Sequence, residues 1–254
     1  MKKESFIQWN NRILGETFSR INYKIFISFI IDASFYAIAF FAFGFWYQRI
    51  IEKMYSMNIP GPDQLAAMGQ ASANEALAQA THFYYALVIS LILLILALIF
   101  LFSIASSLIW SFASGKKPTI RSMSRFLILE IIWAPGWILL IFLISKYAQL
   151  NYVPVFMAIV LIVSYFTTTI LHSLFIRTEK LNSIKTAFKI GFGKIRFYAL
   201  PFASFLVLVY IVSVLARFVN FKYTMAAYFS ILILIACLYR YYFYSISNSL
   251  KSAL

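Results

Sequence analysis

Long apolar stretches separated by shorter polar and basic segments make up most of this chain. A helix rises 1.5 Å per residue, so about 20 apolar residues are enough to cross a hydrocarbon core of about 30 Å. Since backbone polar groups in that core must be paired within their own segment, we expect each long stretch to form an α-helix. The predicted spans are about 25–47, 83–110, 126–147, 155–176, 198–218 and 223–244.

Two of the more polar segments carry apolar residues at helical spacing, and we expect them to form interfacial helices at about 4–20 and 178–196. In the second segment the apolar residues share one face of the helix. That face consists of Leu181, Ile184, Phe188, Phe192 and Ile195. Cations border it, so their stems can lie on apolar material while their charges reach water. These membrane-surface cations are Lys180, Lys185, Lys189, Lys194 and Arg196.

The composition favours an integral membrane protein. The 254 residues are 63% hydrophobic and only 12% charged, which gives more apolar surface than a soluble domain of this length buries. The predicted fold class is therefore all-α: a polytopic bundle of six transmembrane helices with interfacial amphipathic helices. We expect residues 1–254 to form a single integral membrane domain that lies in the lipid bilayer.

The net charge of +14 could indicate nucleic-acid binding, but most of the 22 lysines and arginines lie in the connecting segments of the predicted spans. This placement is typical of a membrane protein, so we expect no nucleic-acid partner. With six spans, both termini and every second connecting segment lie on the same side of the membrane. Most of the cations are in these segments. The positive-inside rule then predicts a multi-pass protein of the cell membrane with both termini in the cytoplasm.

Three charged residues fall well inside predicted spans, more than two residues from either end, where charges are rare and costly: Asp32, Glu130 and Arg240. Counted from the span ends, all three lie in the predicted cytoplasmic half. One interpretation is a polar vestibule in which Asp32 or Glu130 binds a proton, a cation or a cationic head group, with Arg240 as counter-charge. The alternative is that Arg240 pairs with Asp32 or Glu130 as a structural ion pair.

Uncharged polar residues show the same bias toward the predicted inner ends. Thr168 and His172 are one turn apart on the fourth span, so we include both among the candidate binding residues. The position of His172 near Arg177 predicts an interfacial residue. His82 falls near the opposite face of the bilayer, which excludes a metal site shared by the two histidines.

Chemistry of other kinds has little support in the sequence. The single cysteine, Cys237, allows neither an intrachain disulfide nor a cluster of thiols around a metal. Motifs for nucleotide binding, zinc hydrolysis or nucleophilic catalysis are missing from the sequence. We therefore predict no catalytic residue, no metal and no cofactor, and we expect that the protein is not an enzyme.

The predicted cytoplasmic face is dense in cations, and anionic lipid is attracted by about 1 kcal/mol per surface cation. Besides the cations of residues 178–196, this face carries Lys116, Lys117, Arg121 and Arg125. Recognition of anionic lipid is one interpretation. The other is that these charges only orient the chain in the membrane.

A basic segment followed by a span, a return and a second span occurs three times, beginning near Met1, Gly115 and Thr178. The pieces SGKKPTIRSMSRF and TAFKIGFGKIRFYALP are each a basic turn that runs directly into a span. They resemble the repeated joints of poorly characterised six-helix membrane protein families of prokaryotes, of unknown function. The resemblance covers about residues 100–210 and implies no catalytic residue. The Ala-rich segment before residue 83 departs from the shortest members.

These observations predict a non-enzymatic membrane protein that organises lipid or partner proteins, including a second copy of itself, or moves a small solute. One alternative is a permease subunit of an ATP-driven transporter, in which residues 121–126 or 181–195 would couple to a separate ATPase. An intramembrane enzyme is a third class, which the shortage of nucleophile and base pairs disfavours.

Overall fold

The computed structural model describes residues 6–20, 23–57, 69–218 and 224–252, and the regular structure in these ranges is entirely helical. The helices are α1 (Phe6–Arg20), α2 (Lys24–Ser56), α4 (Gln70–Ser114), α5 (Ile120–Tyr147), α6 (Val153–Thr178), α7 (Ser183–Gly193), α8 (Ile195–Phe218) and α9 (Thr224–Ser252). Six of them, α2, α4, α5, α6, α8 and α9, are long and apolar enough to cross a membrane. The predicted all-α, multi-pass membrane fold is confirmed.

Two helices are much longer than the predicted spans. With 33 and 45 residues, α2 and α4 are about 50 and 68 Å long, against about 30 Å of hydrocarbon. The Ala-rich segment that precedes residue 83 explains the difference for α4, because alanine favours helix without adding much apolar area. The ends of the other spans agree with prediction within three residues, except that α5 begins six residues early, at Ile120, and α9 continues to Ser252. Residues 4–5 and 223 of the predicted segments lie outside the described residues.

The predicted interfacial helix over 178–196 is shorter than expected. Helix α6 continues to Thr178 and ends at Glu179, which adopts a left-handed conformation with φ of 50°. Helix α7 begins only at Ser183, and a break at Lys194 separates it from α8. Ile195 and Arg196 therefore belong to a membrane-spanning helix and not to the interfacial one.

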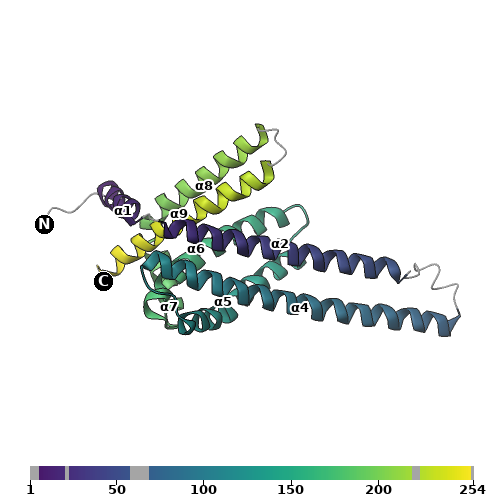
Figure 1. The fold of residues 1–254 in the computed structure, drawn as a ribbon. Helices are drawn as coiled ribbons and strands as arrows, with labels where there is room; N and C mark the ends of the chain where they lie inside the picture. Colours follow the sequence, from purple (N-terminus) through teal and green to yellow (C-terminus); the bar gives the residue numbers. More distant parts are fainter. Residues whose placement is uncertain (1–5, 21–22, 58–68, 219–223, 253–254) are drawn as a thin grey trace. The chain divides into compact units, whose positions relative to one another are not determined.

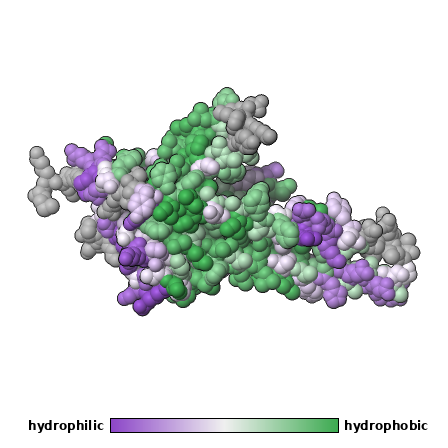
Figure 2. Space-filling view, in the orientation of Figure 1, coloured by the Kyte–Doolittle hydropathy of each residue, from purple (hydrophilic) through white to green (hydrophobic). Residues whose placement is uncertain are grey.

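The chain falls into two compact units. The first combines Met1–Ala33 with Ser103–Leu254 and contains a core of large aromatic residues. In this core Phe126 packs edge-on against Phe175, and Tyr198 stacks on Phe243. Figure 1 shows α8 and α9 side by side as a hairpin, and Figure 2 shows apolar residues over the visible face of that hairpin. Such exposed apolar surface is expected where a protein faces lipid.

The second unit, Ser34–Phe102, is a helical hairpin made of the remaining parts of α2 and α4. Trp46 Nε1 donates to Ser90 Oγ at 3.0 Å, and the rings of Phe35 and Phe102 lie 5.5 Å apart. Many of its large apolar side chains are exposed, including Phe40 at 75%. This hairpin is held by few contacts between its helices and offers most of its apolar surface to the surroundings.

Helix α1 confirms the predicted first amphipathic helix, and it is fixed to α9. The Ile13 side chain is fully buried, and the hydroxyl of Tyr242 donates to Asn10 Oδ1 at 3.2 Å. Ile7 and Phe18, at the edge of this docked face, stay more than half exposed. The docked face of α1 thus contains Asn10, Ile13 and Thr17, and the apolar side chains of Ile7 and Phe18 are left free to contact lipid.

Candidate functional site

Asp32 and Arg240 form a buried ion pair between α2 and α9. The two residues are 3% and 8% exposed, and Nη1 of the guanidinium donates to Asp32 Oδ2. The thiol of Cys237 also donates to this oxygen, with Sγ 3.1 Å away. One turn earlier on α2, Ser28 Oγ lies 3.3 Å from the hydroxyl of Tyr241. Polar contacts therefore hold the first turns of α2 against α9.

Glu130 and His172 form a second buried pair, between α5 and α6. Glu130 is 1% exposed and His172 2%, and Oε1 of the carboxylate lies 2.5 Å from Nε2 of the imidazole. The edge-on rings of Phe126 and Trp110 enclose the imidazole at 5.4 and 6.2 Å. His172 is thus buried in the core of the protein. Its pairing with Glu130 was not predicted.

Thr168 forms a contact of its own, one turn before His172 on α6. Its hydroxyl accepts a hydrogen bond from Trp133 Nε1 at 2.8 Å, which links α6 to α5. Nearer the start of α5, Ser122 contacts Ser107 of α4. Both serines are buried, and their Oγ atoms lie 3.2 Å apart. Most candidate polar residues thus find partners on a neighbouring helix, which is the usual role of polar groups between membrane helices.

A polar node that joins three helices was missed by the sequence analysis. Ser247 Oγ of α9 lies 2.7 Å from Ser173 Oγ of α6 and 3.0 Å from the hydroxyl of Tyr198 of α8. All three residues are buried. No periodicity within one helix indicates such a node. The proximity of Cys237 to Asp32, in contrast, could have been found, because Cys237 and Arg240 are three residues apart on one helix face.

Helix α7 packs one face on the protein and leaves its apolar arc outside. Ser183, Ala187 and Ile190 are 5% exposed or less, and a Cβ placed on Gly191 would lie 3.3 Å from Ile170 of α6. The opposite arc is exposed. On α7 it comprises Phe188 at 42% and Phe192 at 57%, and Leu181, just before the helix, is 44% exposed. Ile184, which was predicted on the same face, packs against the core.

Of the five cations predicted to lie at the membrane surface, Lys185 and Lys189 are on α7, and the other three lie before or after it. Lys180, Lys185, Lys189 and Arg196 are exposed, and Lys194 is half-buried at the break before α8. Arg196 places its guanidinium 4.9 Å from the ring of Phe197. Among the residues described, none of these five cations forms an ion pair. Exposed cations beside exposed apolar side chains are typical of a cationic amphipathic helix.

More cations gather at the C-terminal end of α6. Lys116 Nζ donates to the Ile176 carbonyl at 2.7 Å, and Arg125 Nη1 lies 2.5 Å from Glu179 Oε2. Arg177 lies over the Tyr244 ring at 4.7 Å. Cations at this end of a helix are favoured by its dipole, so part of the basic charge stabilises the fold.

No group of three or more histidine, cysteine or acidic side chains suited to a metal ion occurs in the described part of the chain. Comparisons with models of known protein families, with curated proteins and with solved structures find no match to this chain. The interpretation of the site therefore rests on its geometry.

Proposed function

We propose that this chain is a non-enzymatic membrane protein that gathers anionic lipid at the surface carrying α7. The observation that carries the proposal is the exposed arc of α7, in which Phe188 and Phe192 stay outside the protein although the opposite face is buried. Leu181, just before the helix, is exposed as well. An arc of this kind would bury its apolar side chains at the boundary of head groups and acyl chains. Lys185 and Lys189, both exposed, would then lie among the head groups.

The proposal predicts a measurable preference for anionic lipid. Each surface cation contributes about 1 kcal/mol at low salt, so replacing two corresponds to a loss of about 25-fold in relative association. We would reconstitute the wild type and Lys185→Gln/Lys189→Gln in phosphatidylcholine vesicles. The assay is electron spin resonance, which compares the motionally restricted fractions of spin-labelled phosphatidylglycerol and phosphatidylcholine.

Two control variants make the test specific. The variant Lys185→Arg/Lys189→Arg keeps the charge and should keep the preference for phosphatidylglycerol. The variant Lys146→Gln/Arg217→Gln removes two cations from the distant ends of α5 and α8 and should change it much less. High salt should weaken the wild-type preference through screening. An equal preference in the wild type and Lys185→Gln/Lys189→Gln would refute the proposal.

Movement of a proton or a small cation is a second candidate function, favoured by the burial of Asp32 and Glu130 in helices that otherwise face lipid. Carboxylates inside membrane helices often mark ion or proton pathways. The test is proton flux into vesicles loaded with a pH-sensitive dye, for the wild type, Asp32→Asn and Glu130→Gln. Flux that needs either carboxylate in correctly folded protein would favour this candidate. The same flux in all three proteins would remove it.

A further inference from the structure

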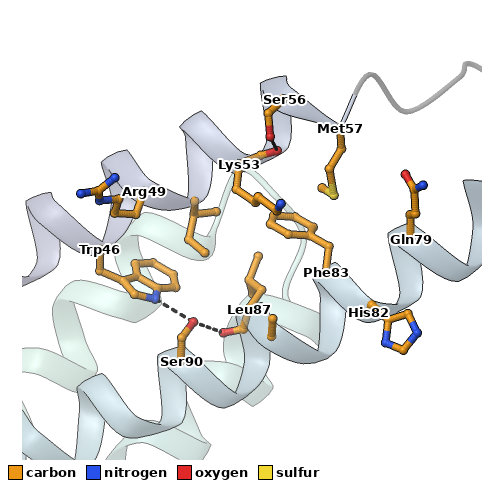
Figure 3. A pocket seen from close by; sticks show the side chains of 12 residues that line it. Trp46, Arg49, Lys53, Ser56, Met57, Gln79, His82, Phe83, Leu87 and Ser90 are labelled. Atoms are coloured by element: carbon orange, nitrogen blue, oxygen red, sulfur yellow. Dashed lines mark hydrogen bonds between the residues drawn. The ribbon is translucent and has the colours of Figure 1, made fainter.

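A pocket of about 790 Å³ lies in the Ser34–Phe102 unit, between α2 and α4. This volume is in the range of small-molecule sites in proteins. Its walls come from both helices, as Figure 3 shows. They comprise Trp46, Arg49, Ile50, Lys53, Ser56 and Met57 on one side, and Gln79, His82, Phe83, Ala86, Leu87 and Ser90 on the other.

The pocket lies where the apolar parts of α2 and α4 meet their polar parts. Trp46 and Ser90, hydrogen-bonded to each other, lie at one end, and Met57 and Gln79 lie at the other (Figure 3). Trp46 is also where the apolar part of α2 gives way to polar residues, and Phe83 is where that of α4 begins. Tryptophan is enriched at this level of a membrane. The pocket therefore spans the boundary between acyl chains and head groups.

The charge of the pocket is positive. Arg49 and Lys53 line it, and the described lining residues include no acidic side chain. Arg49 is partly engaged, since it lies 3.4 Å from Glu52 and 5.2 Å from the Phe45 ring. Lys53 forms no ion pair with any described residue, and Figure 3 shows its side chain pointing from α2 toward α4.

Arg49 and Lys53 lie on the side of the membrane where the sequence predicts few cations. Arg49 and Lys53 belong to the segment that follows the first span, which the positive-inside rule predicts to lie outside the cell. Most other lysines and arginines lie in segments predicted to be cytoplasmic, where the positive-inside rule accounts for them. Lys53 also lies in the last turn of α2, where the helix dipole favours it, but this does not account for the apolar cavity beside it.

We infer that this pocket binds an anionic amphiphile, with its carboxylate or phosphate at Lys53 and its hydrocarbon chain along Phe83, Leu87 and Trp46. The apolar end supplies the area that a chain buries, at about 25 cal/mol per Å². The ammonium supplies a charge-assisted hydrogen bond to the anion. A free fatty acid and an anionic lipid of the membrane share this chemistry.

The experiment measures binding to the full chain purified in dodecyl maltoside. The probes are radiolabelled oleate, lysophosphatidate, dioleoylphosphatidate and the uncharged oleyl alcohol. Lys53→Gln removes the cation but keeps a long helix-forming side chain, and we expect it to weaken binding of the anionic probes about tenfold. Ala86→Phe fills the cavity and should abolish binding.

Matched controls separate binding from folding. Ala97→Phe adds the same ring to an exposed position on the same helix, and Lys146→Gln removes a cation from α5. Both should bind like the wild type. Thermal unfolding without probe should be alike for Lys53→Gln and the wild type. The α7 variant Lys185→Gln/Lys189→Gln should also bind normally, so this inference and the proposed function fail independently.

Each outcome decides something. Binding of oleate supports a free fatty acid as ligand, and binding of dioleoylphosphatidate alone supports a lipid taken from the membrane. Oleyl alcohol bound as tightly as oleate would overturn the inference. The inference would also be overturned if the wild type bound none of the anionic probes. Normal binding of these probes by both Lys53→Gln and a folded Ala86→Phe would overturn it as well.

Discussion

Asp32→Asn should loosen the contact between α2 and α9 strongly. The change leaves Arg240, which is 8% exposed, without its counter-charge in a buried position. Removing one partner of a buried ion pair costs about 3–5 kcal/mol. Cys237 reports the effect directly, because it is the only cysteine of the chain, is fully buried and donates to the same carboxylate.

The assay is labelling of Cys237 with a maleimide in detergent at fixed pH. A fully buried thiol reacts only when the protein opens, and the labelling rate then follows the population of the open form. A cost of about 3 kcal/mol predicts labelling about 100-fold faster in Asp32→Asn than in the wild type. Asp32→Leu/Arg240→Met, which removes both charges, should label more slowly than Asp32→Asn.

The control is Glu52→Gln on the same helix. Glu52 pairs with Arg49 in solvent, with side chains 51% and 67% exposed, and such pairs contribute less than about 1 kcal/mol. Its labelling rate should stay close to that of the wild type. If Asp32→Asn labelled within about twofold of the wild type, the ion pair would not hold α2 in place and this reasoning would be wrong.

Two further predictions concern packing and hydrogen bonding, and both are tested by the free energy of unfolding. Gly191→Leu should cost about 1–3 kcal/mol, because a side chain there meets Ile170 of α6, whereas Gly193→Leu should cost less because nothing lies within 4 Å of its Cβ position. Equal costs would contradict the close approach of α7 to α6. Ser247→Ala should cost about 1–3 kcal/mol, since two buried hydroxyls lose a partner, while Ser19→Ala in an exposed position should change stability little. Equal stability of Ser247→Ala and the wild type would exclude a structural role for the node.

Hydropathy was sufficient for the number, type and approximate place of the helices. It failed for α2 and α4, because the continuation of a helix into water depends on helix propensity and not on apolar content. It also failed between α6 and α7. A left-handed residue at Glu179 ends α6 inside a pattern that reads as one amphipathic helix.

The site was predicted in part. The cost of a charge inside a span selected Asp32, Glu130 and Arg240 as candidate residues, and the structure buries all three against partners. The sequence left two pairings open for Arg240, and the structure pairs it with Asp32. Glu130 instead meets His172, because the rotation of α5 and α6 about their axes brings these two side chains together. Such rotations follow from packing of whole helices and are not encoded in the spacing of one of them.

The unusual length of α4 supplies a marker for the direction in which the chain is threaded. Glu75 is exposed and precedes Phe83 by eight residues, about 12 Å along the helix axis and therefore clear of the apolar stretch. A thiol introduced there by Glu75→Cys would react without competition from Cys237, because Cys237 is buried. Reaction of intact cells with a reagent that cannot pass the membrane would then show on which side this end of α4 emerges, and with it the direction of every other helix.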